Sequence, residues 1–272
     1  MRSSTATFTR VASMRRGALI ALVITCGFFS NHRPLAAATE SVVSAALAAE
    51  ASLQTQRALE LFLTAEKTQP NDPFILRKIA RQYSDLEVEL KITAEKKASI
   101  ERALDYAQRA TAVEPHHAEN VLSVAICYGK LAFFANPSRK VEYSRLVRDH
   151  TLRALALDPD YAWAHHLLGR WHYEVSTLGA TTRVFVKLFY GGLPAASTAE
   201  AVDHLRRAVD LEPTQLQHHL ELGFALIAHG LPAQARIAFT AGLALPSREK
   251  HDETAMARAR IALAKITPDP RP

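Results

Sequence analysis

Small and apolar residues recur along the chain with a spacing that predicts helices packed in pairs. Four segments carry small residues at helical spacing and end in a proline, namely residues 58–70, 103–115, 151–159 and 201–213. A weaker fifth segment covers 235–242. In the clearest cases the small residues are seven positions apart, which places them on one helix face where a neighbouring helix can approach closely. We expect each proline to mark the start of the next helix, because its missing N–H costs nothing there.

A second phrase follows each proline and joins an apolar residue to a small one. It occurs at Ile79-Ala80, Val124-Ala125, Leu168-Gly169 and Leu222-Gly223, and in the first two units an aromatic ring stands three positions later. The small residue can seat against a partner helix while the ring fills the groove beside it. Alternation of the two phrases predicts helix–turn–helix units that stack on one another.

The spacing of the units is longer than the 34 residues of a plain array of such hairpins. Pro70, Pro115, Pro159 and Pro213 are separated by 45, 44 and 54 residues, so each unit carries an insertion between its two helices. The insertions fall at 86–100, 131–142 and 174–198, and long first helices with extended turns are the simplest interpretation. Strand signals are nearly absent. The predicted fold is an all-α solenoid over residues 39–272, with a short N-terminal helix pair and a polar capping helix over 251–265.

Both phrases together resemble the tetratricopeptide repeat. Further segments resemble the regulator of microtubule dynamics protein family over about residues 55–265. The matching residues are Arg77-x-x-Ala80-Arg81, the 103–110 segment, Ala125-Ile126-Cys127, Leu168-Gly169-Arg170-Trp171-x-Tyr173 and Lys187-Leu188-Phe189. The resemblance implies a tetratricopeptide-like interaction module that is linked to microtubules and, in some members, to membrane contact and lipid binding.

Residues 1–38 have the pattern of a signal peptide. Arg15 and Arg16 precede an apolar run over 17–29, and the small residues Ala36-Ala37-Ala38 follow it. The run suits a signal sequence and is shorter than the roughly 20 residues of a membrane-spanning helix. We expect cleavage near Ala38 and export to the periplasm or the exterior. A retained N-terminal anchor and an organellar transit peptide are the alternatives, and an exported chain would not meet tubulin.

The net charge of +6 is concentrated in this leader, which holds five arginines ahead of the first acidic residue, Glu40. The rest of the chain is close to neutral, which argues against nucleic acid as a partner. Cys127 is the one cysteine outside the leader and stands in an apolar run, so it is expected to be a core residue.

The predicted concave surface of the solenoid offers the first candidate site. In such arrays the inner helix presents fixed positions to a groove. Those positions hold Arg77, Arg81, Lys130, Trp163, His166, Arg170 and Tyr173, together with Glu119, Glu174, Gln217, Glu221 and Phe224. Guanidinium groups one helical turn apart can clamp a carboxylate or phosphate, and nearby rings can cover an apolar part of the ligand. The alternative is that these arginines pair with Asp85 or other acids as structural surface charge.

The insertion at 181–192 is the second candidate. It is the most apolar stretch outside the leader and contains Arg183, Phe185, Lys187, Phe189 and Tyr190. It could form a lid over the groove or a surface that touches lipid. The alternative is a short helix packed against the solenoid and stopped by Gly191-Gly192. Burial of both phenylalanine rings would weaken the membrane interpretation.

Twelve histidines raise the question of a metal site, but adjacent pairs such as His165-His166 point in different directions and no His-Glu-x-x-His occurs. We expect no metal and no cofactor. Nucleotide-binding and nucleophile-elbow motifs are absent from the sequence, so no catalytic residue is proposed. The sequence therefore favours a non-catalytic scaffold that binds a protein partner or an anionic ligand in its groove. A lipid-binding or membrane-contact module that uses 183–190, with a possible anionic lipid as partner, is the alternative, and a cryptic enzyme subunit is the third.

Overall fold

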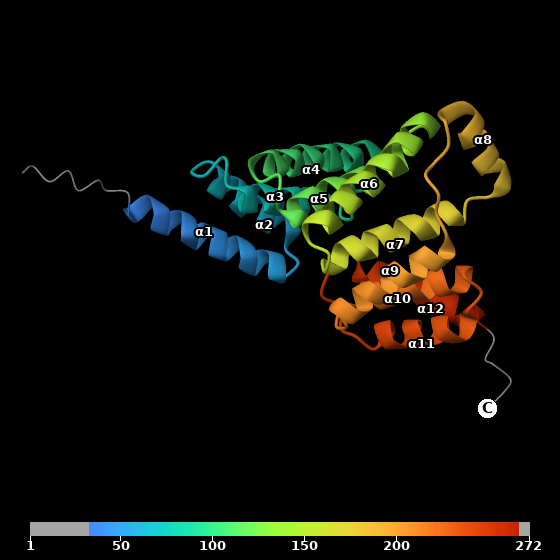
Figure 1. Cartoon of the computed structure of the whole chain (residues 1–272). Coiled ribbons are helices and arrows are strands. Elements are labelled where there is room, and N and C mark those ends of the chain that lie inside the picture. The colour runs from blue at the N-terminus through green and yellow to red at the C-terminus, as the bar shows by residue number, and fades with distance from the viewer. Residues whose placement is uncertain (1–32, 267–272) are drawn as a thin grey trace, which may run out of the picture.

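A computed structural model describes residues 33–266, and every regular element in that range is a helix (Figure 1). The helices follow one another as stacked hairpins. They are α1 (Arg33–Ala51) with α2 (Thr55–Glu66), α3 (Pro73–Leu86) with α4 (Thr93–Val113), α5 (Ala118–Leu131) with α6 (Pro137–Leu157), α7 (Ala162–Ser176) with α9 (Thr198–Leu211), and α10 (Leu216–Ala228) with α11 (Pro232–Leu243). The 3-10 turn η1 (Ala132–Phe134) follows α5, α8 (Ala180–Tyr190) interrupts the fourth hairpin, and α12 (Asp252–Lys265) closes the array. The prediction of an all-α solenoid is confirmed.

Two details of the predicted hairpins are wrong. The prolines at 70, 115, 159 and 213 lie in the turns, and each following helix begins three residues later. In α3 it is Pro73 that opens the helix, directly after Asp72, whose Oδ1 accepts a hydrogen bond from the Ile75 N–H at 3.0 Å. The first two insertions lengthen the second helix of each hairpin and not the first, since α4 and α6 have 21 residues and α3 and α5 have 14.

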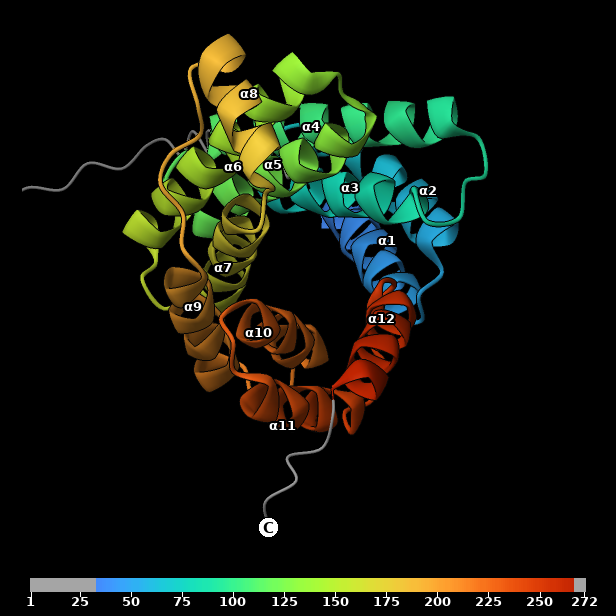
Figure 2. The same ribbon diagram turned by 90° about the vertical axis from the view of Figure 1, so that its right-hand side faces the viewer.

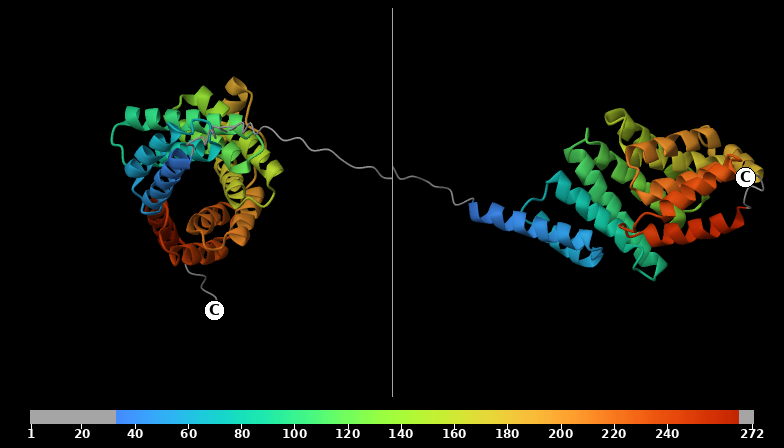
Figure 3. Two further views of the ribbon diagram at one scale, coloured as in Figure 1. Left: turned by 90° about the vertical axis from the view of Figure 1, so that its left-hand side faces the viewer. Right: turned by 90° about the horizontal axis from the view of Figure 1, so that it is seen from below.

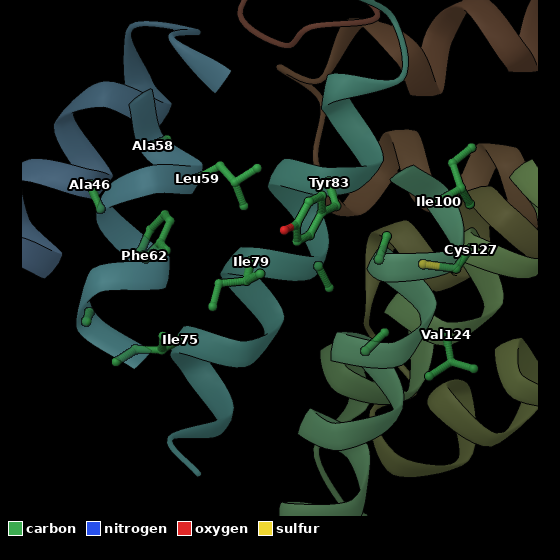
Figure 4. Packing of buried hydrophobic residues seen from close by; sticks show 14 of the residues in the cluster. Ala46, Ala58, Leu59, Phe62, Ile75, Ile79, Tyr83, Ile100, Val124 and Cys127 are labelled. Carbon is green, nitrogen blue, oxygen red and sulfur yellow. The ribbon is translucent and has the colours of Figure 1, made fainter. Parts of the chain in front are cut away.

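The core lies between the paired helices, where the small residues of the two sequence phrases are buried. Phe62, Ile75 and Ile79 are enclosed by alanines of α1 and α2 in the N-terminal cluster (Figure 4). Ala80, Ala110 and Ala208 are buried at helix contacts, as predicted from the repeat. Gly169 and Gly223 are buried too, and a Cβ added to Gly223 would lie 2.5 Å from the Phe239 ring. The register of the repeats therefore follows from the close approach that these small residues allow.

The hairpins curve around a central opening (Figures 2 and 3), and the segment that leads into α12 returns to the first units of the array. Side chains of the segment just before α12 contact the first units of the array. Lys250 Nζ lies 2.6 Å from Glu89 Oε1, Glu249 pairs with Arg81, and His251 Nε2 is 3.5 Å from Asp85 Oδ1. The solenoid thus completes about one turn and meets its own beginning.

The predicted signal peptide falls mostly outside the described residues. Of that segment, the structure describes only the backbone from Arg33, where α1 begins, so the predicted cleavage site after Ala38 lies within the first turns of this helix. Within residues 33–266, none of the helices has the length and apolar character needed to cross a membrane.

Candidate functional site: a central cavity

A cavity of about 820 Å³ occupies the inside of the curved array. Its walls come from α3, α5, α7, α10 and α12, which surround the opening seen in Figure 2. Six of the seven residues predicted for the groove line it: Arg77, Arg81, Lys130, Trp163, His166 and Arg170. The structure therefore brings together residues that lie up to 93 positions apart in the sequence, because each sits at an equivalent inward position of its own helix.

Tyr173 does not line this cavity. It packs with the C-terminal core cluster, where Phe224 also lies. Of the further residues expected at inner positions, Glu119, Gln217 and Glu221 line the cavity, whereas Phe224 faces a smaller pocket beside Arg258 and α12.

The arginines of α3 are paired with carboxylates from other parts of the chain. Arg77 bonds Glu119 of α5, and Arg81 bonds Glu249 while its Nε lies 3.3 Å from Glu50 Oε1 and 3.6 Å from Asp85 Oδ2. This end of the cavity presents alternating charges. An incoming carboxylate would have to compete with those already bound to these two guanidiniums.

Lys130 and Arg170 form a second pair of cations on the cavity wall. Lys130 Nζ donates to the Ser84 carbonyl oxygen at 2.7 Å and lies 3.1 Å from His251 Nε2, and neither of these partners is a carboxylate. Arg170 donates from Nε to Glu174 Oε1 at 2.9 Å, which is its only hydrogen bond within residues 33–266. An ammonium has three donors and a guanidinium five, so both side chains retain donors for a ligand.

Burial and neighbouring charges shift the pKa values of this region, and the charge of Arg170 acts on Lys130. Burial lowers the pKa of Lys130, the carboxylates of Asp85 and Glu87 oppose that effect, and the positive charge of Arg170 lowers the pKa of Lys130 further. Burial also disfavours the charged form of Arg170, but Glu221 and Glu174 more than compensate and raise its pKa. For Asp85, burial alone would raise the pKa, yet the hydrogen bond from His251 and the charge of Lys130 lower it. An anion placed between Lys130 and Arg170 would relieve their mutual repulsion.

Aromatic side chains form part of the wall. The Trp163 ring lies 5.1 Å from the His166 ring and 4.8 Å from that of His218, centroid to centroid. Phe74, Phe133 and Tyr161 also line the cavity and were not foreseen, nor were the residues that the final segment contributes, namely Glu249, His251 and Arg258. The surface is thus a mixture of rings and paired charges, which suits a ligand with both apolar and charged parts.

The histidines do not gather around a metal position. His165 and His166 point in different directions from α7, since His165 bonds the Pro159 carbonyl and His204, whereas His166 bonds His218. Among the described residues, no group of three or more His, Cys, Asp or Glu side chains could hold a metal ion. The absence of a cofactor remains a prediction.

Cys127 is a core residue, as expected. Its side chain is buried in the cluster that joins α3 to α5, and burial raises the pKa of its thiol to about 12. A nucleophilic role would require a thiolate near neutral pH, so this cysteine does not suit one.

The 183–190 segment forms most of α8 and lies apart from the cavity (Figure 1). Gly191 ends this helix in the left-handed conformation with φ 75°, as expected from the sequence. None of the five predicted residues, Arg183, Phe185, Lys187, Phe189 and Tyr190, lines the central cavity, and a lid formed by this segment stays a prediction. Phe185 and Phe189 are 45% and 67% exposed, and the helix has no buried residue. Burial of the two phenylalanine rings, which would have weakened a membrane role, is therefore not found.

A curved array of helical hairpins whose inner helices line a central cavity defines a helical-repeat protein of the tetratricopeptide type. The folds of two solved structures agree with this class. TTC0263, a thermophilic TPR protein of Thermus thermophilus, superposes with a TM-score of 0.60 over 82% of this chain and 99% of its own, at 19% identity. PilF of Pseudomonas aeruginosa gives a TM-score of 0.50 over 86% of this chain and 93% of its own, at 14% identity.

The sequence comparisons identify the family within this class. The profile of the family described as regulator of microtubule dynamics protein 1-3 matches residues 43–267, so the chain belongs to that family. Regulator of microtubule dynamics protein 3 of Xenopus laevis is 29% identical over 160 residues, which are 59% of this chain and 35% of the relative. Regulator of microtubule dynamics protein 1 of Bos taurus is 26% identical over 162 residues, 59% of this chain and 51% of the relative. The chain thus matches about a third to a half of the length of these relatives.

Proposed function

We propose that the protein is a non-catalytic scaffold that binds an acidic, partly apolar segment of a protein partner in its central cavity. The observation that carries the proposal is the pair Lys130 and Arg170, two cations that face one cavity and keep unused donors, with the charge of Arg170 lowering the pKa of Lys130. A carboxylate between them gains charge-assisted hydrogen bonds, while Trp163 covers the apolar part of the ligand. Because the helices fix these groups in place, little order has to be gained on binding.

The experiment uses a short peptide of glutamate, leucine and phenylalanine with a free C-terminus. A matched peptide contains glutamine instead of glutamate and ends in an amide. Inorganic phosphate is the third probe and tests whether a bare anion suffices. Trp163 is a cavity residue and reports binding by fluorescence, and replacing the buried Trp171 by phenylalanine removes the second tryptophan signal.

We expect the acidic peptide to bind more tightly than its neutral counterpart. Lys130→Gln and Arg170→Gln should each lower the affinity about tenfold or more, since a hydrogen bond to a charged group contributes roughly 1.5–3 kcal/mol. Arg139→Gln is the matched control, because Arg139 pairs with Glu142 on α6 and does not line the cavity. Equal binding of both peptides, insensitive to salt and to the two variants, would discard the anionic site.

Membrane contact through the 183–190 segment is the second candidate function, and the exposure of Phe185 and Phe189 favours it. Association of the protein with phospholipid vesicles tests it. Binding to microtubules comes to this chain only through the name of its relatives. It requires a chain that stays in the cytosol, and sedimentation with polymerised tubulin tests it directly.

A further inference from the structure

The helix α8 is an excursion that the repeat array does not need. It leaves the chain after α7 and returns before α9, yet α7 and α9 pack directly against each other (Figure 1). Its principal neighbour is α6, where the Arg145 guanidinium donates to the carbonyl oxygens of Tyr190 at 2.6 Å and Gly192 at 2.5 Å. The helix is therefore held at its C-terminal end and displayed away from the core.

The exposed apolar residues of α8 share one face. Val184 and Leu188 are one turn apart, and so are Phe185 and Phe189, whose rings are 4.7 Å apart. Their exposed fractions are 58%, 74%, 45% and 67% in that order. At 100° per residue these four positions cover an arc of about 140°.

The remaining residues of the helix give this face an orientation. Val186 and Tyr190 are only half exposed and lie on the opposite side, toward α6. Arg183 and Lys187, also one turn apart, lie on the polar side of the helix, with Arg183 beside Tyr190 and Lys187 nearer to the apolar face. The apolar face thus points away from the body of the protein, and the polar side of the helix carries two cations.

The charge of the segment favours an anionic binding partner for this face. No aspartate or glutamate occurs between Glu174 and Glu200 in the sequence, so the two cations have no acidic neighbour on α8 or its flanking turns. Anionic headgroups supply the counter-charge that these cations lack, whereas a second copy of the chain carries the same cations and does not supply it. The face of an 11-residue helix is also small beside the roughly 800 Å² per partner that a stable protein interface buries.

We propose that α8 lies in the surface of a bilayer that contains anionic lipids, with Val184, Phe185, Leu188 and Phe189 among the acyl chains and Arg183 and Lys187 at the headgroups. This inference rests on the second proposed function and specifies its lipid class and its orientation. A helix of this length, about 16 Å, lies flat in the interface and does not span the membrane. The anchor from Arg145 holds the helix so that the face is presented before binding.

The test uses the chain from Thr39 onward, because the apolar run of the leader would itself enter bilayers. All residues of the described core clusters lie after this position, so the shortened chain retains its core. Binding is measured by co-sedimentation with vesicles of phosphatidylcholine alone and with vesicles that also contain phosphatidylserine. Analytical ultracentrifugation over a range of concentrations measures self-association in parallel.

We expect binding to the anionic vesicles and little to the neutral ones. Arg183→Gln/Lys187→Gln should weaken binding roughly fivefold for each charge removed, and Phe185→Ser/Phe189→Ser should abolish it. The matched control is Arg236→Gln/Ile237→Ser on α11, which removes an exposed cation and an exposed apolar residue elsewhere and should bind as wild type. Thermal midpoints should stay equal in all variants because none of these side chains is buried.

Each other result overturns the proposal in a distinguishable way. Absence of binding to both kinds of vesicle rejects membrane contact as a whole. Equal binding to both rejects the anionic selectivity and keeps the membrane function. A concentration-dependent dimer that Phe185→Ser/Phe189→Ser abolishes would assign the face to a second copy of the chain.

Discussion

His166 of α7 and His218 of α10 meet in the interior of the array, with their Nδ1 atoms 2.9 Å apart. Both rings are buried, and Trp163 packs against each of them. A hydrogen bond between two Nδ1 atoms needs one protonated nitrogen and one unprotonated nitrogen. Protonating the second nitrogen of the donor ring places a charge in the core, and protonating the accepting Nδ1 of the other ring breaks the bond.

This contact predicts a loss of stability in mild acid. Burial, with a smaller effect from the charge of His219, lowers the pKa of His218 to about 4. Burial, together with the charges of His218 and Arg170, lowers the pKa of His166 well below its ordinary value. The unfolded chain, with histidine pKa values near 6.5, binds more protons than the folded one between about pH 6.5 and 4. The contribution of these histidines to the free energy of unfolding is therefore largest above about pH 6.5, and it decreases as the pH drops toward 4.

Denaturant unfolding at a series of pH values checks this prediction. The loss of unfolding free energy that comes from His218 alone should be on the order of 3 kcal/mol. His204 adds to this loss, because burial and the charges of His165 and His172 lower its pKa to about 4. The variant His166→Phe/His218→Leu should flatten the acid part of the profile, whereas His116→Gln on the surface should leave it unchanged. A wild-type stability that is constant from pH 7 to 4 would contradict the prediction, and NMR titration of the histidines reads the same pKa values without a variant.

Replacing a buried glycine by alanine should destabilise this protein, although the same change usually stabilises a helix by about 1 kcal/mol. A Cβ on Gly169 would lie 2.7 Å from Leu205 Cγ and 3.0 Å from the Ala201 carbonyl oxygen, and backbone cannot yield as a side chain can. We expect Gly169→Ala to cost about 1–3 kcal/mol in unfolding free energy through overpacking. Gly179→Ala is the matched control, because nothing lies within 4 Å of its added Cβ. An equal stability for both variants would mean that α7 and α9 are not in this register.

The fold could be predicted because the small residues encode the closest contacts between helices. Ala80, Gly169 and Gly223 repeat at one position of each hairpin, and that position decides which helix faces meet. The prolines were less informative, since a proline is equally well accommodated in the turn that precedes a helix. The lengths of α4 and α6 were misassigned because an insertion between two helices can extend either one.

The candidate site was predictable only in part, and for geometric reasons. Inner positions such as Arg77, Lys130 and Arg170 follow from the repeat register alone. Tyr173 packs instead with the C-terminal core cluster, a contact between distant parts of the chain that the repeat register does not specify. Glu249 and His251 reach the cavity because the curvature of every hairpin adds up to a full turn, and no local pattern in the sequence specifies that sum.

The leader predicts export, and the N-terminus of the native protein tests it. The arginine-flanked apolar run and Ala36-Ala37-Ala38 fit a signal peptide that is removed in the mature protein. Mass spectrometry of the protein purified from its native source should find Thr39 at or near the N-terminus. Recovery of the terminus at Met1 or Arg2 in the soluble cytosolic fraction would contradict export. An intact terminus in the membrane fraction would favour a retained anchor.

The contact between Lys250 and Glu89 predicts that the closure of the array depends on charge. Lys250 Nζ lies 2.6 Å from Glu89 Oε1, beside the pair of Glu249 with Arg81. Lys250→Glu would place a carboxylate next to Glu89 and open the ring. We expect a larger radius of gyration in small-angle X-ray scattering, with little change in stability because half-exposed pairs contribute about 0–1 kcal/mol.

The reversed pair Lys250→Glu/Glu89→Lys is the control for this prediction, since it restores opposite charges and should restore the wild-type scattering curve. High salt should act like the single variant, because ions screen exposed charges over a distance of about 8–10 Å. Lys97→Glu, which breaks an exposed pair with Glu101 on α4, should leave the shape unchanged. If the Lys250→Glu scattering curve matches that of the wild type, packing of α12 on α10 and α11 closes the ring without the ion pairs.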